Sequence, residues 1–212
     1  MKKLLLSILT LCAIFVGMND SASARPISYP GGWHVMPMSD AMGQSIHINY
    51  SPSFKYSVGI LSEYMQDDEY SMHTFELNTL PWRLNSENSQ ANIYLKFGLG
   101  VAEDDKEARP AMWTAFAADW EDRRYFTSYE ARFINAVDIE QTAHQSARVG
   151  IAPYVAEFGS LHTWLMLQVD HHPSEEDNFE ITPLVRFFKG PTLMEIGYGS
   201  ERNLLFNVTY VF

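Results

Sequence analysis

The sequence predicts an all-β fold, an antiparallel barrel of twelve strands, with ten strands as the alternative count. Apolar and polar side chains alternate with a period of two along most of the chain, which is typical of β-strands. No segment carries a convincing 3.6-residue apolar stripe longer than two helical turns, so no substantial helix is expected. The chain has 212 residues and a single cysteine, Cys12, which excludes a disulfide scaffold.

The composition limits the classes of function that the chain can have. The chain has 15 Lys and Arg residues and 26 Asp and Glu residues, which gives a formal net charge of -11. An acidic chain of this kind is not expected to bind nucleic acid, which requires a basic face to neutralise phosphates. Hydrophobic residues make up 46% of the chain and aromatic residues 14%, which indicates a folded protein and excludes intrinsic disorder.

Residues 1–24 are predicted to be a cleaved export signal. Two lysines follow Met1, the residues from Leu4 to Met18 form an apolar stretch, and Ala22-Ser23-Ala24 supplies the small residues of a cleavage site. Cleavage would leave one domain, residues 25–212, without cysteine. Such an exported domain has no disulfides, thiolate metal ligands or cysteine nucleophile.

The last predicted strand shows the alternation most clearly. Every second residue from Leu204 to Phe212 is apolar or aromatic, and Asn207 and Thr209 lie between them. The same pattern extends back through the chain and divides it into twelve segments. These predicted strands cover residues 32–38, 44–50, 55–65, 70–81, 91–101, 111–120, 124–135, 146–156, 161–170, 178–188, 191–199 and 203–212.

The predicted connections differ in length. An even number of strands returns both ends of the chain to the same side of a barrel. On that side we expect short turns at 121–123, 157–160 and 189–190, and on the other side the long acidic connections at 103–110, 137–144 and 171–177. The segment 83–90 is long for a turn of the short side. Pro183 lies inside a predicted strand and, because proline cannot donate a ladder hydrogen bond, implies a bulge or a break.

An amphipathic strand that ends the chain in Phe212 resembles the C-terminal assembly signal of bacterial outer-membrane β-barrels. Aromatic residues near predicted strand ends fit the interfacial girdles of such barrels: Tyr50, Tyr56, Tyr64, Trp120, Tyr125 and Tyr210. In size and strand count the chain is similar to the small monomeric oligosaccharide porins. The resemblance implies a transmembrane barrel in a Gram-negative outer membrane, with lipid, lipopolysaccharide and the barrel-assembly machinery as partners. A soluble periplasmic barrel that binds a ligand is the alternative, because it shows the same alternation.

If the apolar face contacts lipid, the opposite face lines a lumen. The predicted lining is nearly balanced in charge, which favours a network of cross-strand ion pairs. Its members are the acids Glu63, Glu76, Asp119, Glu130, Glu180 and Glu195 and the bases Lys96, Arg124, Arg132, Arg148 and Arg186. The sequence therefore predicts a narrow channel for small polar solutes or a plugged structural barrel. In a channel, the four arginines would contact anions.

A second candidate site lies near the start of the predicted domain. His34, Met36 and Met38 alternate onto one strand face, and a hairpin around residues 39–42 would place His47 beside His34. Thioether and imidazole groups are ligands for Cu(I) or Ag(I). A metal-handling barrel is therefore a further alternative, with a copper-like ion as its cofactor. Methionine as a filler of irregular interiors is the simpler interpretation, and then no cofactor is expected.

A catalytic role is not favoured by the sequence. Asp170 and His172 lie at one predicted rim and are the candidates for a hydrolase, but no nucleophile accompanies a base on the same face. Glycine-rich phosphate loops and the HExxH and CxxC motifs are missing from the sequence. We therefore assign no catalytic residue.

Overall fold

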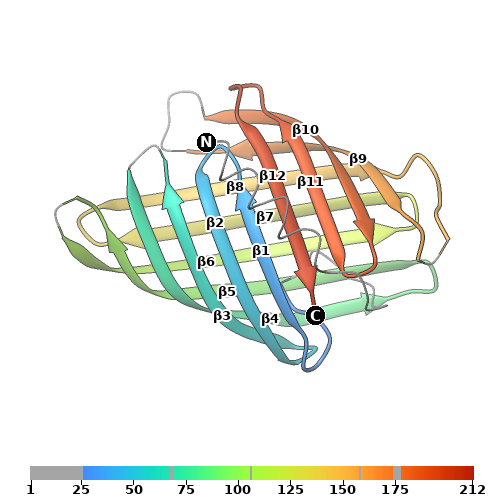
Figure 1. The fold of residues 1–212 in the computed structure, drawn as a ribbon, viewed down its shortest axis with the longest axis horizontal. Coiled ribbons are helices and arrows are strands. Elements are labelled where there is room, and N and C mark those ends of the chain that lie inside the picture. The colour runs from blue at the N-terminus through green and yellow to red at the C-terminus, as the bar shows by residue number, and fades with distance from the viewer. Residues whose placement is uncertain (1–25, 67–68, 106, 158, 174–177) are drawn as a thin grey trace, which may run out of the picture.

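The computed structural model describes residues 26–212, apart from 67–68, 106, 158 and 174–177. The chain forms a closed antiparallel barrel in which each strand pairs with its neighbours in sequence and β1 pairs with β12 (Figure 1). The strands are β1 (Trp33–Ser39), β2 (Gly43–Ser53), β3 (Tyr56–Met65), β4 (Tyr70–Asn85), β5 (Ser89–Glu103), β6 (Ala108–Asp122), β7 (Tyr125–Ala136), β8 (Glu140–Ile151), β9 (His162–His171), β10 (Phe179–Lys189), β11 (Thr192–Tyr198) and β12 (Leu204–Val211). The predicted twelve-stranded barrel is confirmed.

The two ends of the barrel differ in what they contain. The start of β1 and the end of β12 lie together, since Trp33 and Phe212 exchange backbone hydrogen bonds of 2.7 and 2.9 Å. We call this the terminal end, and the opposite end, which includes the β1–β2 turn, the loop end. The predicted signal, residues 1–24, lies outside the described residues. Within the described part of the chain, no helix is long and apolar enough to cross a membrane.

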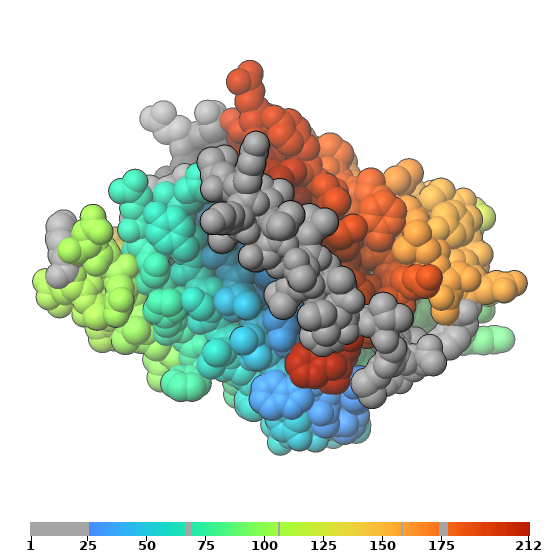
Figure 2. Space-filling view, viewed as in Figure 1, coloured from blue at the N-terminus to red at the C-terminus, as the bar shows by residue number. Residues whose placement is uncertain are grey.

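The barrel wall is taller on one side than on the other. β4, β5 and β6 have 16, 15 and 15 residues, whereas β1, β11 and β12 have 7, 7 and 8. Figure 1 shows the strands of the near wall crossing those of the far wall, as expected for a tilted barrel. In the space-filling view of the same side, side chains fill the spaces between neighbouring strands where described residues are visible (Figure 2).

The outer surface of the barrel is apolar and the inner surface is largely polar. Large hydrophobic side chains point outward from the strands, with Phe75 77% and Leu99 68% exposed. Their sequence neighbours Glu76 and Gly98 point inward and are buried. A soluble barrel has the opposite arrangement, with apolar side chains inside and polar ones outside. The inward and outward faces follow the alternation in the sequence.

The position of β8 differs from the prediction. The strand covers Glu140–Ile151, not 146–156, and the connection before it is a turn of residues 137–139 with Asp138 at φ 60°. The long connection is instead 152–161, at the terminal end, where only short turns were expected. Pro153 explains why β8 stops early, because a residue without an N–H cannot continue a central ladder. The predicted difference in connection length between the two ends is therefore wrong here.

β4 and β5 extend further than predicted. Their register shifts between Thr79 and Trp82, which places a bulge at Pro81 and allows the strand to continue to Asn85. The expected long segment 83–90 is thus mostly strand, and its turn is only residues 86–88. The expected long connection 103–110 is also shorter, because β5 continues to Glu103 and β6 begins at Ala108, so only residues 104–107 connect them.

Pro183 neither breaks nor bulges β10. Thr182, Pro183 and Leu184 pair in unbroken register with β9. On the other edge, the β10–β11 ladder ends at the pair Leu184 and Gly197. Pro183 lies immediately beyond that last pair, so its missing N–H leaves no gap in the β10–β11 ladder. The predicted bulge or break at Pro183 is wrong for this reason.

Candidate functional site

A cavity of about 300 Å³, lined by both charged and apolar side chains, lies inside the barrel. Among the described residues that line it, acidic side chains outnumber basic ones by eight to four. The acids are Asp40, Glu63, Glu76, Asp119, Glu121, Glu130, Asp170 and Glu195, and the bases are Lys96, Arg132, Arg148 and Arg186. The near balance inferred from the sequence is therefore wrong, and the cavity lining carries an excess of negative charge.

Arg132 on β7 pairs with Glu63 on β3 across the interior. Two guanidinium nitrogens donate to the two carboxylate oxygens, at 2.9 and 2.6 Å, in a bidentate arrangement. The guanidinium also lies 4.9 Å from the ring centre of Trp113, whose indole N–H donates to Thr74 Oγ1 at 3.0 Å. These contacts fix the Arg132 side chain in one orientation.

A second cation of the interior pairs with a carboxylate on the next strand but one. Lys96 on β5 places its Nζ 2.7 Å from Glu130 Oε2 on β7. Asp119 on β6 accepts a hydrogen bond of 2.6 Å from the amide of Asn92 on β5. These contacts join β5 to β7 and to β6, and they leave few orientations open to the charges.

Glu195 on β11 binds two arginines of the neighbouring wall. Its Oε1 accepts hydrogen bonds from Arg148 at 2.9 Å and from Arg186 at 2.6 Å, and its Oε2 accepts one from Asn207 at 2.9 Å. Arg148 also donates from Nε to the side-chain oxygen of Gln168 at 2.9 Å. Two of the arginines expected to attract anions are thus engaged by one carboxylate.

Two of the predicted lumen charges lie outside the central network. Arg124 lies in the turn between β6 and β7 and is exposed. Glu180 is buried at the start of β10, near the loop end, where it accepts a hydrogen bond of 3.3 Å from Asn203. The predicted track of four arginines is therefore not formed, because one lies in a turn and the other three pair with carboxylates.

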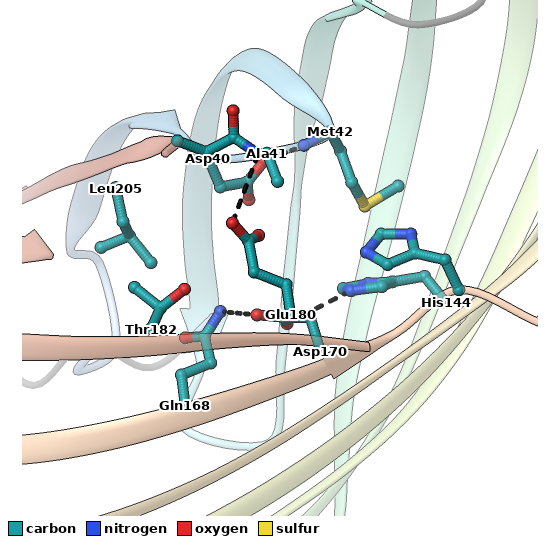
Figure 3. A pocket seen from close by; sticks show the side chains of 11 residues that line it. Asp40, Ala41, Met42, His144, Gln168, Asp170, Glu180, Thr182 and Leu205 are labelled. Carbon is teal, nitrogen blue, oxygen red and sulfur yellow. Dashed lines mark hydrogen bonds and ion pairs between the residues drawn. The ribbon is translucent and has the colours of Figure 1, made fainter. Parts of the chain in front are cut away.

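Carboxylates and histidines gather at the loop end (Figure 3). Asp170 Oδ1 lies 3.3 Å from His144 Nε2, and the ring centres of His144 and His172 are 4.5 Å apart. The carboxyl groups of Asp40 and Glu180 point toward each other in Figure 3. The sequence combined Asp170 with His172 as candidate hydrolase residues, whereas the ion pair is made by His144. The misplaced start of β8 concealed this histidine.

Asp40 is held in the β1–β2 turn of this loop-end cluster. Its Oδ1 accepts hydrogen bonds from the backbone N–H groups of Met42 at 3.0 Å and Gly43 at 3.3 Å. Burial, together with the neighbouring carboxylates of Glu63 and Asp170, raises the pKa of Asp40 above its usual value. The sequence analysis missed Asp40, since only the barrel brings this turn close to β9 and β10.

Apolar clusters border the cavity toward both ends. Leu61, Met72 and Trp113 belong to a buried group of ten residues near the loop end. Near the terminal end, Ile27 packs with Leu80, Tyr94 and Ala117. The alternation in the sequence did not indicate these clusters, because their members are widely separated along the chain.

The residues just before β1 enter the terminal end of the barrel. Ile27 is only 5% exposed. The carbonyl oxygen of Pro26 accepts a hydrogen bond of 2.6 Å from Ser57 Oγ, and the N–H of Ser28 donates to Ser51 Oγ at 2.9 Å. We call residues 26–28 the N-terminal segment. Its contacts narrow the interior at this end.

The histidines and methionines near β1 are arranged differently from the prediction. In the β1–β2 register, His47 lies opposite Met36, and His34 lies opposite Asn49. Met36, Met38 and His47 line the cavity, and His34 is fully buried on the same inner face. His47 was expected beside His34; the β1–β2 hairpin is instead centred one residue further along the chain, with Ser39 opposite Gln44, and this shift places Asn49 opposite His34.

The comparisons with known proteins provide an architectural likeness. Protein-family models give no match to the chain, and no curated protein matches it in sequence. Two solved structures are similar to it: a KdgM porin in complex with disordered oligogalacturonate, at 10% identity, and a KdgM porin, at 8% identity. Each alignment has a TM-score of 0.49 and covers 85% of this chain and 98% of the porin chain. A likeness at this level of identity does not assign a function.

Proposed function

We propose that the protein is a narrow outer-membrane channel that passes small polar solutes and prefers cations. The observation that carries the proposal is the acid-rich cavity inside a closed barrel with an apolar outer surface. Three arguments support it, from the outer surface, the cavity charge and the cavity size.

The outer surface fits a lipid environment. An exposed apolar belt of this extent would be unfavourable in water, and a closed barrel satisfies all ladder hydrogen bonds inside a membrane. Most of the strands have ten or more residues, enough to cross a bilayer at the tilt of a barrel. In the periplasm the same belt would require a covering partner. Lipid and lipopolysaccharide would contact the belt, and the C-terminal strand would engage the assembly machinery.

The cavity charge favours cations over anions. Arg132, Arg148 and Arg186 each contact a carboxylate, so an entering anion would have to compete with an existing ion pair. The acidic excess remains after these pairs are formed and lowers the potential inside the barrel. Rings of acidic side chains select cations in channels of known type.

The cavity size favours small solutes. A volume of about 300 Å³ is at the lower limit of pockets that hold drug-sized molecules. The apolar cluster near the loop end and the N-terminal segment at the terminal end border this volume. A permeating solute would therefore be small, and its passage would require movement of side chains or of the N-terminal segment.

Planar-bilayer recording tests the proposal. With purified protein and a KCl gradient, we expect small conductance steps and a reversal potential that shows cation preference. Asp119→Asn keeps the hydrogen-bond acceptor for Asn92 and should reduce that preference. Glu157→Gln, in the exposed β8–β9 connection, is the matched control and should leave it unchanged. If the protein shows no opening at any voltage, it is a structural barrel; if anions are preferred, the charge argument fails.

A further inference from the structure

His34 is a fully buried histidine that has no hydrogen-bond partner among the described residues. Its exposed fraction is 0%, and neither ring nitrogen has a partner within the described residues. Buried polar groups in native proteins are nearly always paired, and an unpaired one costs about 1–3 kcal/mol. This imidazole is therefore available to a ligand that the rest of the chain does not supply.

A second imidazole nearby is held in a fixed orientation. His47 Nδ1 lies 3.0 Å from Glu76 Oε2, and the amide of Asn49 donates to the same carboxylate. In the tautomer that donates from Nδ1, the lone pair of Nε2 is left available. A carboxylate that orients a histidine in this way is the usual second partner of metal-binding histidines.

Two methionine thioethers, those of Met36 and Met38, lie on the same inner face as these imidazoles. Met36 is directly opposite His47, and His34 and Met38 flank Met36 on the same inner face of β1. Directly opposed residues have Cβ atoms about 5 Å apart, and residues two apart on a strand are about 6.6 Å apart. The flexible methionine side chains can span these separations. We call His34, Met36, Met38 and His47 the His/Met cluster.

We propose that the His/Met cluster binds a soft monovalent metal ion of the Cu(I) class, with Met36 and His47 as its central ligands. Thioether and imidazole donors suit Cu(I) and Ag(I), and the carboxylate of Glu76 adds a favourable negative charge. In the described part of the chain, no group of three or more His, Cys, Asp or Glu residues is placed to hold a metal ion. The site thus depends on its methionines, and it does not require that the barrel conduct ions.

Silver titration tests the metal site. Ag(I) is the probe because it shares the ligand preference of Cu(I) without its redox chemistry. Equilibrium dialysis of the full barrel in detergent, without chloride, should give one bound Ag(I) per chain. Met36→Leu should weaken binding at least tenfold. Met112→Leu is the matched control, because Met112 points outward from β6 and is 49% exposed, and it should bind as the original protein does.

A spectroscopic measurement on the unaltered protein makes the test independent of variant folding. X-ray absorption of the silver-loaded barrel should show both sulfur and nitrogen neighbours. Excess Zn(II) should not displace the silver. The proposal is overturned if the protein binds no silver stoichiometrically, if Met36→Leu and Met112→Leu bind equally well, if only nitrogen or oxygen neighbours are found, or if Zn(II) displaces the silver.

Discussion

Glu195 is the residue on which one half of the interior network depends. It is 3% exposed and accepts hydrogen bonds from Arg148, Arg186 and Asn207. Arg186 also places its guanidinium 4.6 Å from the ring centre of Phe126. One carboxylate therefore determines the positions of side chains from three other strands, β8, β10 and β12.

Replacing Glu195 by glutamine should destabilise the barrel. The change leaves the buried Arg186 and the half-buried Arg148 without a negative partner, and breaking a buried pair of this kind costs about 3–5 kcal/mol. Denaturant unfolding in detergent, followed by tryptophan fluorescence, should show the loss. Glu157→Gln, at an exposed position, should leave the free energy of unfolding unchanged. A similar stability for both variants would mean that water satisfies the two arginines.

Asp40 should make the stability of the barrel depend on pH. Its pKa is raised by burial and by the carboxylates of Glu63 and Asp170, with His144 opposing them; Glu180 also points toward it. Between its usual and its raised pKa, the native state binds more protons than the unfolded state. Stability therefore falls as pH rises through that window.

The variant Asp40→Asn should weaken this pH dependence. Its amide oxygen can still accept the hydrogen bonds from Met42 and Gly43, so the turn is kept while the titrating charge is lost. We expect the variant to gain stability relative to the original protein as pH rises from the usual pKa of an aspartate through the raised pKa of Asp40. Unfolding free energies across this range measure the effect. Parallel pH curves for the two proteins would contradict it.

At the scale of elements, the hairpins show where local sequence rules fail. The β7–β8 turn contains Val137, Asp138 and Ile139 and has neither glycine nor proline, although Asp138 takes a positive φ. By contrast, the β10–β11 turn has Gly190 at φ 56°, followed by proline, and was predicted correctly. A distinctive turn residue is not always required, because the end of β3 at Met65 and the start of β4 at Tyr70 were predicted although residues 66–69 contain neither glycine nor proline.

The N-terminal segment should act as a removable restriction at the terminal end. Ile27→Ser removes the apolar contact with Leu80 and Tyr94 at a cost of about 2 kcal/mol, which reduces docking about thirty-fold. Single-channel conductance should therefore rise, while the migration of the unheated barrel in a detergent gel stays the same. Val155→Ser, at an exposed position of the β8–β9 connection, is the control. Equal conductance of both variants would show that the restriction lies elsewhere.

At the scale of the whole molecule, the polarity of the two faces decides the environment. An arginine at Phe97, which points outward near the middle of β5, should cost about 2–4 kcal/mol if lipid surrounds it. An arginine at Val137, in the exposed β7–β8 turn, should cost about 0–1 kcal/mol. Unfolding in lipid vesicles measures the difference. If Phe97→Arg is neutral in vesicles, the outer face does not contact the bilayer core.

The candidate site was only partly predictable from the sequence. The two-residue alternation of apolar and polar side chains identifies which residues point inward. It correctly placed Glu63, Arg132 and Glu195 on the inner face. It cannot identify partners, because Glu63 and Arg132 are 69 positions apart and meet only through the closed barrel. Asp40 and His144 were missed for the same reason.

The sequence by itself determined the all-β fold and, for most strands, which residues share a face, and it favoured twelve strands over ten. These properties depend on alternation, which is a local property of the chain. The tertiary structure alone decided which charges pair, where the acidic excess lies, and that apolar clusters border the cavity near both ends. The physical reason is that barrel closure and register bring distant strands together, and contacts across the interior depend on that geometry.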